Sequence, residues 1–262
     1  MMRTLWQPTQ RVLRPLRARA MAITIALSLL TGASRANAAD MALLPIIKPA
    51  QSCETLATTA LPGIGDPSPA IESAAMIETA KGPFCRVSGT IAPAIHFEVD
   101  LPAVHWTQRY IAVGCGGLCG SMPSSLSYVA NCAPAVNGEL ALGFNDMGHE
   151  SHMGAPDPAA FAADPQKRID FAYRANHLTT LLAKALIRAY YGQAQKYAYF
   201  VGCSDGGREA LMEAQRYPED FDGISAGDPA ALLTIQNSFG GTWQRQDNLR
   251  AGTVRGSGNV LG

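Results

Sequence analysis

The chain has 262 residues, of which 47% are hydrophobic, and it carries 21 basic and 21 acidic side chains. This composition is sufficient to bury a core and excludes an intrinsically disordered chain, and the length suits one large α/β domain or two small ones. The balanced charge argues against nucleic acid or an acidic membrane surface as a partner.

The first 38 residues have the pattern of an export signal. A stretch rich in arginine precedes an apolar run, Ala20–Leu30, which is too short to cross a bilayer. Ala36-Asn37-Ala38 matches a cleavage site, so the mature chain is expected to begin at Ala39. An uncleaved membrane anchor is the alternative. We expect a secreted or periplasmic protein with no stable membrane association.

Export favours disulfide bonds among the six cysteines, which are Cys53, Cys85, Cys115, Cys119, Cys132 and Cys203. Six cysteines allow many connectivities, so the spacing alone leaves the pairing open. The pair Cys115 and Cys119 has no second matched pair or histidine couple nearby, and we therefore predict no metal site in the chain.

The first part of the mature chain shows little periodicity. Residues 39–51 are expected to lack regular structure, Cys53–Ala60 to form a short helix, and Pro62–Pro69 to form a loop rich in proline and glycine. Regular structure is therefore expected to start beyond this loop.

Four strands are predicted next. Phe84–Pro93 and Ile95–Leu101 alternate apolar and polar residues, as antiparallel strands do when one face is buried. Arg109–Gly114 is a continuous apolar run of the kind buried in a parallel sheet, and Leu140–Asn145 is a second candidate of that kind. These patterns predict a sheet that is antiparallel at one side and parallel at the other.

The second half alternates helices and strands. A loop is predicted at Phe161–Lys167, followed by an amphipathic helix at Arg168–Tyr191 that Gly192 ends. Further elements are expected in the order strand Lys196–Val201, helix Arg208–Tyr217 and strand Phe221–Gly227. This alternation predicts an α/β fold with a doubly wound sheet. The catalytic region is placed at residues 39–249, and residues 250–262 are expected to form an irregular tail.

The motif Gly202-Cys203-Ser204-Asp205-Gly206 matches the Gly-x-Ser-x-Gly nucleophile elbow. It lies between a predicted strand and a predicted helix, which is the context that such a serine requires. The turn is tight, so small residues must flank the serine. We predict that Ser204 is a catalytic nucleophile, and the alternative is a serine in a structural loop.

An acyl-transfer serine needs two N–H groups aimed at the developing oxyanion. One is expected from the backbone of Asp205, the residue after the nucleophile. The other is expected from Gly116 or Gly117, in a glycine-rich stretch that follows the Arg109–Gly114 strand. A plain tight turn is the alternative. A phosphate-binding loop is disfavoured because no Gly-Lys-Ser/Thr follows.

All five histidines precede Ser204, although the acid and the histidine of an α/β-hydrolase triad follow the serine. Either the triad is unusual, or the chain stops before its acid and base, and we favour the second explanation. Asp146, His149 and His152 are interpreted as polar loop residues near the substrate mouth, with a metal site as the alternative. Asp228, after the next strand, is an alternative triad acid.

Several motifs in order resemble the tannase and feruloyl esterase family of α/β-hydrolases, which includes mono(hydroxyethyl) terephthalate hydrolase. The blocks are Gly114–Gly120, Asn145–His149, Asp170–His177, Tyr190–Gly192, Gly202–Glu209 and Glu213–Ile224. The resemblance covers about Cys53 to Gly241, the N-terminal part of such an enzyme. It implies that the sheet is truncated before its last strands and before the lid domain.

The resemblance implies roles for individual residues. Ser204 is the nucleophile, and Cys203 is half of a disulfide whose partner, a cysteine after the catalytic histidine, is absent here. Cys53–Cys85 is the first disulfide expected, and Cys119–Cys132 a second, weaker one. Calcium belongs to the family's lid domain, so we expect no cofactor in this chain.

Together these observations predict a serine carboxylesterase that hydrolyses small aromatic-acid esters, such as feruloyl or galloyl esters. The alternative is a catalytically dead fragment or pseudoenzyme that lacks the triad acid and histidine. A carbohydrate- or polyphenol-binding module has little support, because the chain has three tryptophans and Trp6 lies in the signal region. The sequence specifies neither the acyl and alcohol groups nor the oligomeric state.

Overall fold

The computed structural model describes residues 44–123, 126, 129–152, 154–232, 234–240, 242, 243 and 246. The predicted export signal, its cleavage site and the tail 250–262 lie outside these residues. The chain divides into two units, Met1–Leu44 and Pro45–Gly262, and the second contains all of the strands and helices named below. In the described part of the chain, no helix is long and apolar enough to cross a membrane.

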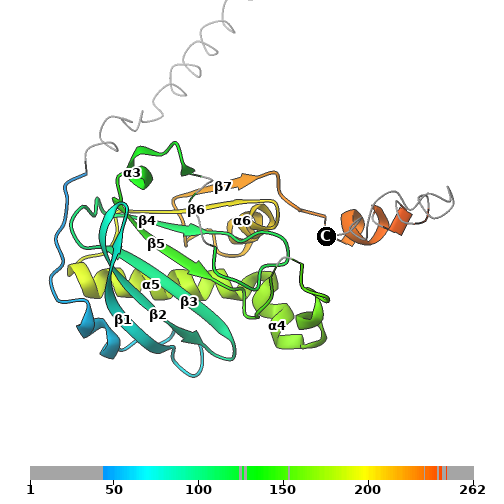
Figure 1. Cartoon of the computed structure of the whole chain (residues 1–262), viewed down its shortest axis with the longest axis horizontal. Helices are drawn as coiled ribbons and strands as arrows, with labels where there is room; N and C mark the ends of the chain where they lie inside the picture. Colours follow the sequence, from blue (N-terminus) through cyan, green and yellow to red (C-terminus); the bar gives the residue numbers. More distant parts are fainter. Residues whose placement is uncertain are drawn as a thin grey trace, which may run out of the picture. The chain divides into compact units, whose positions relative to one another are not determined.

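A seven-stranded mixed sheet organises the second unit, in the order β1-β2-β3-β5-β4-β6-β7 (Figure 1). The strands are β1 (Ala70–Thr79), β2 (Gly82–Ile91), β3 (Ile95–Pro102), β4 (Arg109–Val113), β5 (Leu140–Asn145), β6 (Tyr197–Cys203) and β7 (Gly223–Gly227). The β1–β2, β2–β3 and β3–β5 pairs are antiparallel, and the β5–β4, β4–β6 and β6–β7 pairs are parallel. The predicted α/β fold, antiparallel at one side and parallel at the other, is confirmed.

The helices connect the parallel strands. The α-helices are α3 (Ala133–Val136), α4 (Pro165–Ile169), α5 (Ala175–Tyr191) and α6 (Asp205–Arg216). Shorter elements are the 3-10 helices η2 (Glu54–Thr58) and η4 (Ala160–Ala163), and the π-helices η5 (Asp170–Arg174) and η6 (Thr234–Gly240). As predicted, α5 ends at Gly192, which adopts the left-handed conformation with φ 71°.

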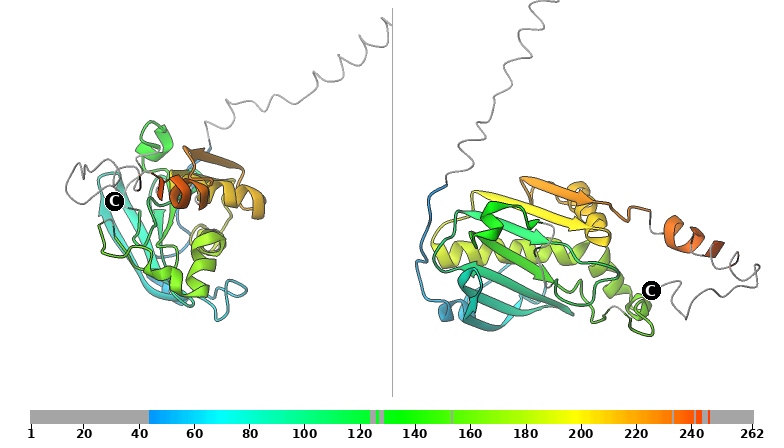
Figure 2. Two further views of the ribbon diagram at one scale, coloured as in Figure 1. Left: turned by 90° about the vertical axis from the view of Figure 1, so that its right-hand side faces the viewer. Right: turned by 45° about the horizontal axis from the view of Figure 1, so that its top comes forward.

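Two hydrophobic clusters lie on the two faces of the sheet, because successive side chains of a strand point to opposite faces. Tyr110 and Ala112 of β4 belong to the larger cluster, which includes buried residues of α5 and α6. Ile111 and Val113 belong to the smaller cluster, with Ala135 of α3. Figures 1 and 2 show α5 running along one face of the sheet. Burial on both faces explains the continuous apolar run of β4.

The long helix begins earlier than predicted. Asp164 caps it by accepting hydrogen bonds from the backbone N–H groups of Gln166 and Lys167, at 2.8 and 3.4 Å, and Pro165 occupies the first helical position. The predicted loop Phe161–Lys167 is therefore wrong, because Phe161–Ala163 belong to η4 and Pro165–Lys167 to α4, with Asp164 between them. The missed signal is an aspartate followed by proline, a usual start of a helix.

The strand β1 was not predicted. It pairs with β2 at the edge of the sheet, and its residues are exposed or half-buried along its whole length. An edge strand with so little burial has no apolar alternation in its sequence, so only the pairing with β2 identifies it.

The structure has two disulfide bonds in its described part, and they confirm one of the two expected pairings and contradict the other. Cys53 and Cys85 form a disulfide, as the resemblance implied. Cys119 is bonded to Cys115, so the expected Cys119–Cys132 bond is wrong. The reason is local, since a tight turn brings Cys119 back to the start of its own loop, with its N–H 3.0 Å from the carbonyl oxygen of Gly116. Cys132 and Cys203 are free thiols.

Candidate active site

Ser204 lies at the sharp turn between β6 and α6. Its backbone has φ 60° and ψ −115°, a conformation that residues with a Cβ rarely adopt. The turn is held from both sides, because the N–H of Ser204 donates to the carbonyl of Gly227 and the N–H of Ala230 donates to the carbonyl of Ser204, at 3.0 and 2.9 Å. The side chain is exposed. The geometry is that of a nucleophile elbow.

Two glycines of the motif are required by close backbone contacts. A Cβ on Gly202 would lie 2.3 Å from the carbonyl oxygen of Gly206, so the strand and the helix approach too closely for a side chain. A Cβ on Gly206 would lie 2.8 Å from the carbonyl oxygen of Cys115. The helix α6 therefore packs directly against the loop that follows β4.

We call this loop, Gly114–Gly120, the oxyanion loop. It leaves the sheet where the N–H of Gly114 donates to the carbonyl of Val201, at 2.9 Å, which places it beside the end of β6. A Cβ on Gly116 or on Gly117 would meet no atom within 4 Å, so these two residues face open space. The structure thus brings the two predicted oxyanion residues and the elbow to one edge of the sheet.

The side chain of Asp205 is buried, although only its N–H had been assigned a role. Its carboxylate accepts two hydrogen bonds from the Arg208 guanidinium, from Nε at 2.7 Å and Nη2 at 3.0 Å. Arg208 also donates to the backbone carbonyls of Phe171 and Ala172 in the π-helical turn η5. This arginine therefore joins α6 to the segment before α5.

Four side chains at this place have ligand atoms within 4.8 Å of one another, namely Cys115, Cys119, Asp205 and Glu209. The two sulfur atoms are bonded to each other. We therefore assign no metal to this group.

His149 supports the oxyanion loop. Its Nε2 lies 2.8 Å from the carbonyl oxygen of Leu118, and its ring stacks on Phe161 with the centroids 3.8 Å apart. His149 is thus a polar loop residue that contacts the oxyanion loop, whereas His152 is exposed. The side-chain hydrogen bonds of Asp146 go to His96 and Gly148 and not to either histidine, and these three residues do not form a candidate metal group in the described part of the chain.

Asp146 instead pairs with His96, whose Nδ1 lies 2.5 Å from the carboxylate. The hydrogen bond to Asp146 raises the pKa of His96, and burial raises the pKa of Asp146. His96 lies on β3, which β5 and β4 separate from β6, so about 14 Å lies between the strand of this histidine and the strand that leads to the elbow. The dyad is too far away to deprotonate Ser204 directly.

The remaining histidines are also placed elsewhere. His177 bonds to Asp220, with Nδ1 2.6 Å from the carboxylate, and stacks on Tyr217, while His105 is exposed. All five histidines lie in the described part of the chain, and none is hydrogen bonded to Ser204. Asp228 is exposed and follows β7, next to the elbow.

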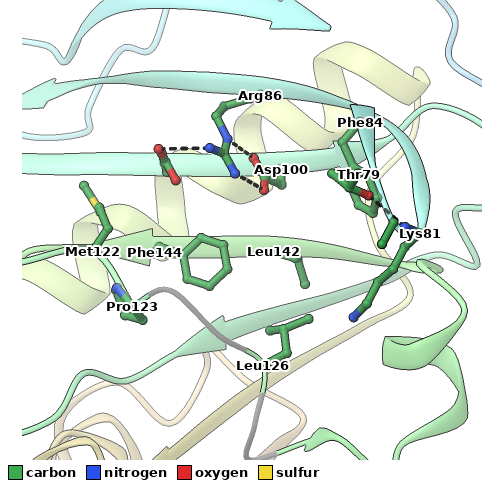
Figure 3. Close-up of a pocket in the computed structure, with 12 residues that line it drawn as sticks. Thr79, Lys81, Phe84, Arg86, Asp100, Met122, Pro123, Leu126, Leu142 and Phe144 are labelled. Atoms are coloured by element: carbon green, nitrogen blue, oxygen red, sulfur yellow. Dashed lines mark hydrogen bonds and ion pairs between the residues drawn. The ribbon is translucent and has the colours of Figure 1, made fainter. Parts of the chain in front are cut away.

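A cavity of about 580 Å³ is lined by residues of β2, β3 and β5, and Ser204 is not among its lining residues (Figure 3). Its apolar lining includes Phe84, Leu142 and Phe144, and one wall carries Arg86, which is paired with Asp100. A second cavity of about 410 Å³ lies against β4 and β6. Neither is lined by Ser204 or the oxyanion loop, so cavity size does not identify this site.

The seven-stranded sheet and the strand–elbow–helix unit define an α/β-hydrolase fold. An esterase from Aspergillus oryzae shares this fold, with a TM-score of 0.61 and 25% identity over 74% of this chain and 40% of that one. Feruloyl esterase B from Aspergillus oryzae also shares it, with a TM-score of 0.59 and 27% identity over 73% of this chain and 39% of that one.

The sequence profile of the family described as tannase and feruloyl esterase matches residues 78–255, and the chain belongs to this family. It is 39% identical to an uncharacterized esterase of Xanthomonas campestris over 62% of this chain and 27% of that protein. It is 34% identical to the mono(2-hydroxyethyl) terephthalate hydrolase of Piscinibacter sakaiensis over 69% of this chain and 32% of that enzyme. The chain thus spans about a third of the length of these relatives.

Proposed function

We propose that this chain carries the nucleophile and the oxyanion site of a secreted serine carboxylesterase that acts on small esters of aromatic acids. The observation that supports this most directly is the strained backbone of Ser204 beside a glycine-rich loop that faces open space. Membership in the tannase and feruloyl esterase family supports the ester substrate and its aromatic acid.

In the proposed reaction, the Ser204 hydroxyl attacks the ester carbonyl carbon, and the alcohol leaves as an acyl-enzyme forms. The N–H of Asp205 and that of Gly116 or Gly117 stabilise the negative charge on the carbonyl oxygen. Asp205 is the first residue of α6, so its N–H has no acceptor within the helix, and the helix dipole favours negative charge at this point. Water then hydrolyses the acyl-enzyme.

The proposal assigns no general base to this chain, because the five histidines make other contacts or are exposed. Asp146 and Asp220 hold two of them, and His149 is bound to the oxyanion loop. Loss of triad members leaves a residual acceleration of about 10³ to 10⁴ from the oxyanion site and substrate binding. A chain of this kind is therefore expected to turn substrate over slowly.

The secretion proposed here rests on the arginine-rich start, the apolar run Ala20–Leu30 and the Ala36-Asn37-Ala38 pattern. N-terminal sequencing of the exported protein tests it, with Ala39 expected as the first residue. The Cys53–Cys85 disulfide agrees with an oxidising compartment.

The function is tested with the purified chain against methyl ferulate, methyl gallate and a terephthalate monoester, beside its Ser204→Ala variant. Because the residual acceleration comes from the oxyanion site and substrate binding, similarly slow product release by both chains is the expected result. Mass spectrometry after incubation with a fluorophosphonate checks whether Ser204 is covalently modified. Modification of Ser204 is expected, and a soluble, folded chain with neither turnover above the uncatalysed rate nor modification of Ser204 would contradict the proposal and favour a non-catalytic pseudoenzyme.

A further inference from the structure

Glu209 lies buried on α6, directly beneath the oxyanion loop, and is only 2% exposed. Its Oε1 lies 2.7 Å from Sγ of Cys115 and 3.4 Å from Sγ of Cys119. A Cβ on Gly114, the first residue of the loop, would lie 3.0 Å from its Oε2. The disulfide of the oxyanion loop therefore lies on the Glu209 carboxyl group, which contacts both of its sulfur atoms, while Oδ2 of Asp205 lies 3.5 Å from Sγ of Cys119.

The other oxygen of Glu209 is tied to the opposite side of the site. Oε2 accepts a hydrogen bond from Nδ2 of Asn176 on α5, at 2.8 Å. Asn176 in turn accepts from Nδ2 of Asn145 at the end of β5, at 2.7 Å, and Asn145 accepts from the backbone N–H of Met147, at 2.8 Å. A buried chain of amide side chains thus links Glu209 to the segment after β5.

The surroundings of Oε1 favour a protonated carboxyl group. The sulfur atoms of a disulfide carry no hydrogen, so they offer Oε1 no donor, and the Asp205 carboxylate is also only an acceptor. Burial, and after it the charge of Asp205, raise the pKa of Glu209 to about 8.

The titratable groups that face Glu209 are Asp205, Arg208 and Glu213, all on α6. The residue facing it from α5 is the neutral Asn176, and the oxyanion loop presents the disulfide. At neutral pH, the Glu209 carboxyl group therefore keeps its proton, and no second negative charge forms beside Asp205.

We infer that Glu209, in its protonated form, is a positioning residue that holds the two halves of the oxyanion site, the Asp205 N–H on α6 and the oxyanion loop, in register. This inference rests on the proposed function. It assigns Glu209 no contact with substrate, because the side chain acts through the disulfide on one side and through Asp205 on the other.

Ionisation of Glu209 removes this support. A second carboxylate next to Asp205 repels it, and Oε1 then presents a negative charge to the sulfur atoms of the loop. Asp205 N–H and the loop amides are expected to shift together as Glu209 loses its proton. The Glu209→Gln variant keeps the size of the side chain and stays neutral, so it is expected to keep the low-pH arrangement at every pH.

The test follows the backbone amides of the ¹⁵N-labelled full chain by NMR between about pH 6 and pH 9.5, a range that brackets the pKa of Glu209. The amides of Asp205, Gly116 and Gly117 are expected to titrate with one shared midpoint near pH 8 in the wild-type chain, and this titration is expected to vanish in Glu209→Gln.

Glu213→Gln is the matched control. Glu213 is a second buried glutamate of α6 whose pKa burial raises to about 8, and its Oε2 has no hydrogen-bond partner, in the oxyanion loop or elsewhere in the described part of the chain. The shared titration is expected to persist in this variant. Its persistence in Glu209→Gln, or its loss in Glu213→Gln alone, would overturn the inference, as would loop amides that do not follow Asp205.

The measurement needs no turnover, so it separates the inference from the proposed function. In Ser204→Ala, which cannot form an acyl-enzyme, the shared titration is expected to remain. Absence of serine modification together with an intact titration would refute the esterase proposal and leave the coupling between Glu209 and the loop standing. Serine modification with no titration would refute the coupling alone.

Discussion

Replacing Ser204 by glycine is expected to stabilise the fold more than replacing it by alanine. The backbone of Ser204, at φ 60° and ψ −115°, is the mirror image of an extended conformation. Glycine has no Cβ and adopts both mirror forms about equally, whereas serine and alanine are strained there. The serine side chain is exposed, so both variants lose little packing.

The size of the difference follows from two opposing terms. A residue held in a sparsely populated backbone region costs about 1–3 kcal/mol, and glycine relieves this cost. Glycine also loses more conformational freedom on folding, which costs about 0.5–1 kcal/mol relative to alanine. Glycine is therefore expected to exceed alanine at this position by about 1 kcal/mol, and up to ~2 kcal/mol, in the free energy of unfolding.

Urea unfolding followed by circular dichroism measures this difference, with thermal unfolding as a second readout. For a chain of this size, 1 kcal/mol corresponds to about 2–4 °C in Tm. Equal stabilities of the two variants, or a more stable alanine variant, would refute the argument that the elbow stores backbone strain. An unfolded wild-type chain at the start of the titration would invalidate the comparison, so folding is checked first.

Three further predictions concern packing, the disulfide and pH. Gly206→Ala is expected to lower the free energy of unfolding by about 1–3 kcal/mol, because its Cβ would lie 2.8 Å from a carbonyl oxygen of the oxyanion loop. Gly116 faces open space, so Gly116→Ala is expected to change the free energy of unfolding little. Urea unfolding of the two variants measures the difference. Replacing Cys53 and Cys85 together by serine removes a bond that closes a separation of 32 residues, and unfolding measurements are expected to show a loss of about 4 kcal/mol. Burial and neighbouring acids raise the pKa of Glu213 from 4.5 to about 8, so the folded chain holds a proton that the unfolded chain releases. The free energy of unfolding is therefore expected to fall as the pH rises from 4.5 to about 8, by up to ~1.4 kcal/mol per pH unit. Glu213→Gln is expected to remove this pH dependence, which unfolding curves at several pH values measure.

Local patterns were sufficient for the elements that bury apolar residues on a regular period. The strand Leu140–Asn145 is observed with its predicted bounds, and the strand, turn and helix around Ser204 follow from the run of small residues between an apolar segment and a helical one. The edge strand β1 escaped prediction because its half-exposed residues carry no such period. It is a strand because it pairs with β2, and its own residues do not show this pairing.

The helix α6 shows the same limit at the site itself. It was predicted to begin at Arg208 but begins at Asp205, immediately after Ser204, because the elbow needs no linker between strand and helix. The partners of Asp146 and Cys119 were also missed. Asp146 bonds to a histidine of β3 fifty residues away, and Cys119 bonds to a cysteine of its own loop.

The sequence by itself determined the fold class, the position of the tight strand–turn–helix unit at Ser204 and the glycines that this turn requires. These features depend on residues close together in the chain and on sterics that any such turn obeys. Only the tertiary structure decided which buried polar groups support the site. Glu209, Asn176 and the Cys115–Cys119 bond come from different segments, and nothing in their local sequence specifies that they meet. They are neighbours because the parallel strands end at one edge of the sheet, which brings a loop and two helices together over the same few ångströms.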